Sequence, residues 1–156
     1  MQRIAIALVM GFLAVGAGAG RARAQSAPPD SASDSMAIRQ AALDYIEGWY
    51  QGDASRMERA LHPELVKRIV RADSSGGDWI SSMGASQLIA GTRGGFGREV
   101  PAGQQKTDVT ILDVFQNSAS ARIDAGQWID YLHLARVNGR WVIVNVLWEM
   151  LPRVGT

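Results

Sequence analysis

The chain has 156 residues and a formal net charge of +1, from 16 basic and 15 acidic residues, and it contains no cysteine. The missing cysteine excludes disulfides and lipoprotein attachment, and the near-neutral charge lacks the basic stripe that nucleic-acid-binding proteins need. Two histidines and scattered carboxylates show no metal-ligand spacing, so we expect no metal ion, no other cofactor and no nucleic-acid partner.

The first 24 residues have the marks of an export signal. Arg3 precedes an apolar, glycine-rich run over residues 4–20, and Ala22-Arg23-Ala24 has the small-x-small pattern that signal peptidase cleaves. The run is short for a membrane span, contains four glycines and lacks a stop-transfer flank, which favours a cleaved signal peptide over an anchor. We therefore expect residues 1–24 to be removed and the mature protein to be periplasmic or secreted, with no membrane segment left.

Residues 25–35 are rich in Ser, Pro and Asp and show no apolar periodicity, a composition typical of a disordered linker. The remaining residues, 36–152, suit a single domain with one core.

This domain begins with two predicted helices. Over residues 36–51 apolar side chains recur at i, i+4, i+7 and i+11, so they share one helical stripe. The stripe consists of Ile38, Ala42, Tyr45 and Trp49. Gly52 is suited to end this helix, and Asp53 to cap a second, shorter helix that ends before His62-Pro63.

The next segment predicts a short strand over residues 65–71, followed by a loop over residues 73–78. We expect Lys67, Arg68 and Arg71 to lie on the solvated side of this strand.

A short helical segment over residues 85–90 leads into the glycine-rich residues 91–97. These glycines match neither the phosphate-loop pattern nor the dinucleotide-binding pattern, so we predict a flexible turn and leave its role open.

After Pro101 the chain is rich in strands, which predict an antiparallel meander. The predicted strands cover residues 108–115, 118–125, 127–137 and 140–150. Helices that precede a run of strands indicate an α+β domain, in which the helices cover one face of a curved sheet.

Asn138-Gly139 predicts a two-residue hairpin turn, because both residues tolerate the positive φ of a type I′ turn. This turn pairs Val137 with Arg140 and, further out, His133 with Val144. One face of the hairpin then carries Ile129, Tyr131, His133, Val142, Val144, Val146 and Trp148. The other face carries Trp128, Asp130, Leu132, Leu134 and Trp141.

Both faces are largely apolar, so each needs a cover, and the helices supply only one. We expect a homodimer to cover the second face, with the C-terminal tail or a loop as the alternative. The expected anchors of the dimer are Trp128, Leu132, Leu134 and Trp141.

Three segments carry a family resemblance: the helix of residues 41–53, the helix end at Leu61-His-Pro-Glu64, and the strand of residues 139–144. Their order and spacing resemble the nuclear transport factor 2-like superfamily, and within it the SnoaL-like and "putative lumazine-binding" group. The resemblance covers roughly residues 36–151. It implies a cone-shaped domain with N-terminal helices packed on a strongly curved, antiparallel-rich sheet, a pocket against the concave face and a convex face that often forms dimers.

The same resemblance implies a role for Tyr45. In the steroid isomerases of this superfamily, a tyrosine seven residues before the Gly-Asp helix end donates a hydrogen bond to the developing oxyanion, and Tyr45 holds that position. Where those enzymes carry their aspartate base, this chain reads Val66-Lys67-Arg68-Ile69. The resemblance therefore does not extend to the isomerase reaction.

His133 is the candidate general acid or base, because imidazole titrates near neutrality, and Tyr45 or Tyr131 could orient a carbonyl or phenol. A structural strand histidine is an equally good interpretation of His133. The expected ligand-binding residues are Tyr45, Trp49, Trp79, Met83, Ile129, Tyr131, His133, Val144, Val146 and Trp148.

The sequence therefore favours an exported domain that binds a small hydrophobic or aromatic molecule in an apolar, aromatic-lined pocket. An acid–base enzyme of the dehydratase, cyclase or isomerase type, acting on a hydrophobic carbonyl compound, is the first alternative. A dimeric structural or interaction module is the second.

Overall fold

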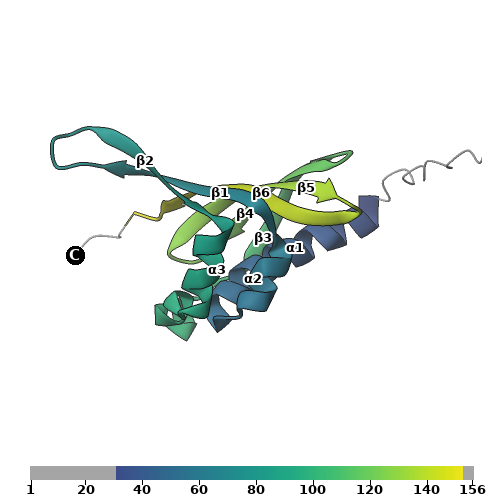
Figure 1. The fold of residues 1–156 in the computed structure, drawn as a ribbon, viewed down its shortest axis with the longest axis horizontal. Helices are drawn as coiled ribbons and strands as arrows, with labels where there is room; N and C mark the ends of the chain where they lie inside the picture. Colours follow the sequence, from purple (N-terminus) through teal and green to yellow (C-terminus); the bar gives the residue numbers. More distant parts are fainter. Residues whose placement is uncertain (1–30, 153–156) are drawn as a thin grey trace, which may run out of the picture.

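The computed structural model describes residues 31–152, which form one layer of helices packed against one curved sheet (Figure 1). The signal peptide predicted over residues 1–24 and the linker residues 25–30 lie outside the described residues. No helix within the described part is long and apolar enough to cross a membrane.

The first helix, α1 (Ser31–Gln51), begins five residues before its predicted start, so the predicted linker did not extend to residue 35. Asp34 explains the early start. This carboxylate is only 5% exposed and accepts hydrogen bonds from Arg136 Nη1 at 3.0 Å and Trp141 Nε1 at 2.9 Å. A tertiary contact with distant strands thus holds the first turn, and no local sequence pattern reveals it.

The helix ends as predicted. Gly52 has a φ of +64°, which glycine adopts without steric cost. Asp53 then caps α2 (Ala54–Ala60), since its Oδ1 accepts hydrogen bonds from the backbone N–H groups of Ser55 and Arg56, both at 3.0 Å.

Six strands form one sheet in the order β2-β1-β6-β5-β4-β3. Their bounds are β1 (Leu61–Ala72), β2 (Asp78–Gly84), β3 (Asp108–Phe115), β4 (Ser118–Asp124), β5 (Trp128–Val137) and β6 (Arg140–Met150). Only β1 and β6 pair in parallel, and the other neighbours are antiparallel. Strand β2 lies in a region for which the sequence predicted no strand. The predicted α+β class, with helices before a meander, is confirmed.

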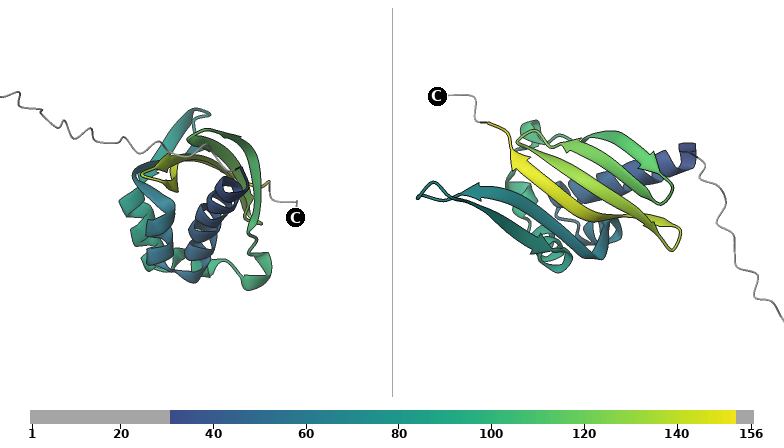
Figure 2. Two further views of the ribbon diagram at one scale, coloured as in Figure 1. Left: turned by 90° about the vertical axis from the view of Figure 1, so that its right-hand side faces the viewer. Right: turned by 90° about the horizontal axis from the view of Figure 1, so that it is seen from above.

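The sheet curves around α1 (Figure 2, left). Between β2 and β3 the chain forms α3 (Ala85–Arg93) and two short turns of 3-10 helix, η1 (Phe96–Glu99) and η2 (Ala102–Gln104). The core fills the space between α1 and the concave face of the sheet, where Ile38, Ile46 and Ile143 are fully buried.

The β5–β6 hairpin follows the predicted register only near its turn. Asn138 and Gly139 have φ values of 52° and 79°. The four pairs nearest the turn, from Val137 with Arg140 to Leu134 with Ile143, are those predicted. Val144 then forms a β-bulge, so that His133 pairs with Asn145 instead. Every pair beyond the bulge is shifted by one residue, which transfers Val146 and Trp148 to the face that carries the even-numbered residues of β5.

The predicted assignment of the two hairpin faces was therefore wrong for β5. The four expected dimer anchors, Trp128, Leu132, Leu134 and Trp141, are at most 8% exposed and belong to the core of this chain. Because successive side chains of a strand alternate in direction, Tyr131 and His133 lie on the opposite, outer face, where both are exposed. The helices of this chain cover the first set, so it cannot anchor a second subunit.

Candidate functional site

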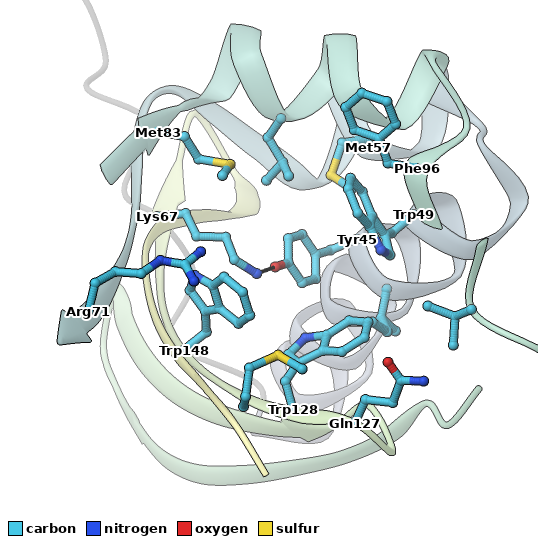
Figure 3. Close-up of a pocket in the computed structure, with 14 residues that line it drawn as sticks. Tyr45, Trp49, Met57, Lys67, Arg71, Met83, Phe96, Gln127, Trp128 and Trp148 are labelled. Carbon is cyan, nitrogen blue, oxygen red and sulfur yellow. Dashed lines mark hydrogen bonds between the residues drawn. The ribbon is translucent and has the colours of Figure 1, made fainter. Parts of the chain in front are cut away.

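A cavity of about 350 Å³ lies between the helices and the concave face of the sheet (Figure 3). Aromatic and aliphatic side chains make up most of its wall: Tyr45, Ile46, Trp49, Met57, Met83, Leu88, Phe96, Val100, Trp128, Trp148 and Met150. The other lining residues are Lys67, Arg71 and Gln127. Such an apolar enclosure with a few polar groups is the usual form of a small-molecule site.

The polar centre of the cavity is Lys67, which is 8% exposed. Its Nζ donates hydrogen bonds to Asp130 Oδ1 at 2.7 Å and to the Tyr45 hydroxyl at 2.5 Å. The same Nζ lies 4.7 Å from the ring centroid of Trp148, within range of a cation–π contact. An ammonium group has three N–H donors, so these two hydrogen bonds leave one donor for a ligand.

Asp130 lies beneath this centre and is fully buried. Its Oδ1 accepts from Lys67, and its Oδ2 accepts from Trp128 Nε1 at 2.7 Å. A buried carboxylate needs such compensation, because an unpaired buried charge is costly. The two hydrogen bonds also fix the positions of Lys67 and the Trp128 indole in the wall.

Burial changes the proton affinity of both partners around Asp130. Burial lowers the pKa of Lys67 from its usual value, although Asp130 opposes this effect by favouring the ammonium form. Burial, together with the nearby charge of Asp130, raises the pKa of Tyr45 well above its usual value. The Tyr45 hydroxyl therefore remains protonated across the physiological range.

The expectation that Lys67 lies on the solvated side of its strand was wrong. Side chains alternate along β1, and Lys67 shares the inward face with the buried Leu65 and Ile69. The sequence signal was ambiguous, because Val66 and Val70 place apolar residues on the other face as well. Of the expected solvated group, Arg68 does lie on the outer side, where its Nη1 donates to Asn145 Oδ1 at 2.6 Å.

Four expected ligand-binding residues do line the cavity: Tyr45, Trp49, Met83 and Trp148. Val146 is buried in the core beside it, and Val144 is the bulge residue of β6. Trp79 is 52% exposed on β2, where it pairs with Arg71 across the hairpin.

The candidate catalytic residues His133 and Tyr131, and the expected lining residue Ile129, lie on the outer face of the sheet. His133 is exposed, and its Nδ1 is 3.2 Å from Asn145 Nδ2. The predicted grouping of these three residues with Trp148 was wrong, because the bulge at Val144 changes which residues of β6 face them. Tyr45 alone of the three candidate catalytic residues contacts the cavity.

One residue of the glycine-rich segment 91–97, Phe96, lines the cavity. A Cβ added at Gly97 would overlap the backbone carbonyl of Trp49, so only glycine allows this close approach. The approach positions the neighbouring Phe96 in the cavity wall. Position 97 is therefore glycine because of its close packing against Trp49.

Among residues 31–152, no three His, Cys, Asp or Glu side chains come close enough together to hold a metal ion.

The family model described as "Putative lumazine-binding" matches residues 33–149. No curated protein matches the chain. A solved NTF2-like protein of unknown function from Shewanella baltica is 20% identical, with a TM-score of 0.61 over 80% of this chain and 99% of its own.

Two further solved structures show the same fold at low identity. An NTF2-like protein of unknown function from Methylobacillus flagellatus is 19% identical, with a TM-score of 0.56 over 77% of this chain and 94% of its own. An NTF2-like protein with a cystatin-like fold from Novosphingobium aromaticivorans is 18% identical, with a TM-score of 0.57 over 80% of this chain and 86% of its own. At this identity the likeness concerns the fold alone, whereas the family model spans most of the chain. The chain therefore belongs to the "putative lumazine-binding" family and has the NTF2-like fold.

Proposed function

We propose that this protein binds a small, flat, largely apolar molecule in the cavity between α1 and the concave face of the sheet. The observation that carries the proposal is the combination of an aromatic wall with a single buried polar centre. Trp49, Trp128 and Trp148 offer ring surfaces, and Lys67 offers a fixed hydrogen-bond donor between them. The family description supports a small-molecule ligand.

The polar centre favours a ligand with a carbonyl oxygen or a ring nitrogen. The remaining N–H of Lys67 can donate to such an acceptor, while the flat ring packs against the Trp148 indole. Lumazine, a flat bicyclic ring with two carbonyl groups, is therefore a suitable first probe. An uncharged aromatic amide, 2-naphthamide, tests the same recognition without the nitrogen heterocycle.

Binding of these two probes can be measured by isothermal titration calorimetry. Lys67→Met should weaken binding about 10-fold or more, because it removes a charged hydrogen-bond donor from a buried site. Arg68→Met is the matched control, since the neighbouring side chain lies on the outer face and its loss should change nothing. Trp148→Leu provides a second variant that leaves the Lys67–Asp130 pair intact. The proposal fails if neither probe binds the wild-type protein, or if Lys67→Met and Arg68→Met behave alike.

A second candidate function is a reaction of Lys67 with a carbonyl compound. Lys67 replaces His133 as the candidate reactive residue, because His133 lies on the outer face. A lysine in an apolar cavity, beside the hydroxyl of Tyr45 and the carboxylate of Asp130, is suited to attack an aldehyde. The neutral amine would add to the carbonyl carbon, and loss of water would leave an imine. Reduction with cyanoborohydride in the presence of 2-naphthaldehyde should then attach one naphthylmethyl group to Lys67. Labelling of surface lysine only would exclude this candidate.

Export is part of the proposal and rests on residues 1–24, whose apolar run and Ala22-Arg23-Ala24 pattern suit a signal peptidase. Expression of the full chain in a Gram-negative host, followed by N-terminal sequencing of the periplasmic protein, tests it. The expected first residue is Gln25, and retention of residues 1–24 would contradict the proposal.

Homodimerisation through the outer face is also part of the proposal, with different anchors from those expected. Tyr131 and Leu147 pair across β5 and β6 on this face, and each is 48% exposed. Val70 and Ile80 on β1 and β2 extend the apolar surface, with 50% and 64% exposure. An exposed group of this kind suits the centre of a protein interface.

A further inference from the structure

Arg71 carries a positive charge that the described residues leave uncompensated. It lies on β1, four residues after Lys67, and lines the cavity. Besides its strand pairing with Trp79, Arg71 contacts Trp148, where the guanidinium carbon is 6.0 Å from the ring centroid. Within residues 31–152, no carboxylate forms an ion pair with Arg71 and no acceptor takes a hydrogen bond from it.

The charges of the cavity do not balance. Lys67 is neutralised directly by Asp130 at 2.7 Å. The residues that line the cavity include Lys67 and Arg71 but no Asp or Glu, so Arg71 leaves a net positive potential in the cavity. The Arg71 side chain is exposed at this cavity, so its charge is accessible to a ligand and favours an anionic group there.

The two cations, Lys67 and Arg71, both lie close to the indole of Trp148. Lys67 Nζ and the Arg71 guanidinium carbon lie 4.7 Å and 6.0 Å from its ring centroid, and Figure 3 shows both side chains beside that ring. A ligand ring that contacts Trp148 therefore lies close to both the Lys67 ammonium and the Arg71 guanidinium. The planar guanidinium fork matches a carboxylate in a bidentate arrangement.

We propose that the ligand of this cavity is a planar aromatic carboxylate, whose acid group pairs with Arg71 while its ring lies against Trp148. This inference rests on the proposed small-ligand function and specifies the chemical class of the ligand. Arg71 is then a specificity-determining residue that selects anionic over neutral aromatic molecules.

The test compares 2-naphthoate with 2-naphthamide, which share a ring system and nearly the same size but differ in charge. We expect wild-type protein to bind 2-naphthoate about 10-fold more tightly than 2-naphthamide in isothermal titration calorimetry, since a charge-assisted pair exceeds a neutral contact. Arg71→Gln should remove this difference by weakening 2-naphthoate about 10-fold and 2-naphthamide less than about 2-fold. Arg71→Lys should retain part of the preference, because the charge stays while the planar fork is lost.

Arg68→Gln is the matched control, because it removes the same charge from the same strand but from the outer face. It should leave both affinities unchanged. Equal weakening of 2-naphthoate by Arg68→Gln and Arg71→Gln would overturn the inference, since only the overall charge would then matter. Equal wild-type affinity for the two probes would also overturn it, but the binding of 2-naphthamide would leave the small-ligand function standing. Failure of both probes to bind would reject the proposed function and this inference with it.

Discussion

Lys67 on β1 and Asp130 on β5 are separated in the sheet by strand β6, and their side chains meet at 2.7 Å on its concave face. The two residues lie 63 positions apart in the chain. Their side chains are 9% and 0% exposed, so this is a buried ion pair. It joins the wall of the cavity to the centre of the sheet.

The buried pair predicts a strong asymmetry between single and double variants. Asp130→Leu should lower the free energy of unfolding by about 3 to 5 kcal/mol, because it leaves the Lys67 ammonium buried without a counter-charge. The double variant Lys67→Met/Asp130→Leu should recover much of this loss. Urea unfolding followed by circular dichroism measures both.

A partly exposed ion pair serves as the control for this prediction. Arg122 and Asp124 approach to 4.0 Å near the surface, so Arg122→Gln should cost less than about 1 kcal/mol. If Asp130→Leu were as mild as Arg122→Gln, the pair would not be buried in solution.

Alkaline pH should destabilise the protein through its buried tyrosines. Burial raises the pKa of Tyr50 to about 12, and the pKa of Tyr45 lies well above its usual value of 10.0. Above pH 10 the unfolded chain releases these phenolic protons while the folded protein retains them, so the free energy of unfolding falls as pH rises.

Tyr50→Phe isolates part of this effect. The Tyr50 hydroxyl donates to the Ala125 carbonyl at 2.8 Å, so the variant should lose about 1 kcal/mol at neutral pH. Between pH 10 and 12, however, it should lose less stability than the wild type. Parallel pH profiles of the two proteins in chemical unfolding would contradict this assignment. Lys67 has the opposite effect on stability, at pH values below 10.5. Because its pKa is lowered in the folded protein, the unfolded chain binds this proton more tightly, so the Lys67 contribution to the free energy of unfolding rises with pH there.

The glycine-rich segment gives a steric prediction with a matched control. Gly97→Ala should lower the free energy of unfolding by about 2 kcal/mol or more, because its Cβ would overlap the Trp49 backbone carbonyl. Gly103→Ala meets no atom within 4 Å and should change stability by less than about 0.5 kcal/mol. Thermal unfolding measures both, and equal effects would contradict the close packing of Gly97.

The outer face gives a prediction about association. Leu147→Glu places a charge at the centre of the exposed apolar surface and should convert a dimer into a monomer in light-scattering measurements. His133→Ala on the same face should leave the affinity for 2-naphthamide unchanged, because His133 lies outside the cavity. A wild-type protein that is monomeric at all concentrations would contradict the proposed dimer.

The elements with a local cause were predictable from sequence. The stripe of Tyr45 and Trp49, the Asp53 cap and the turn at Asn138 each depend on a few neighbouring residues, and the structure shows all of them. These features were enough for the order of elements and for the helical wall of the cavity.

The polar centre was not predictable, because it depends on long-range packing. The bulge at Val144 lies within the valine-rich run Val-Ile-Val-Asn-Val, which gives no sign of where an extra residue is inserted. Without the bulge, Asp130 falls in the register opposite Leu147 instead of Trp148. Lys67 was missed for a related reason, since both faces of β1 carry apolar residues and its charge favoured the solvated side.

A crystal structure of the complex with 2-naphthamide tests the small-ligand function most directly. We expect the naphthalene ring to lie against the Trp148 indole, with the amide oxygen within hydrogen-bond distance of Lys67 Nζ. A ring bound instead on the outer face beside Tyr131 and His133, with the cavity unfilled, would contradict the proposed function.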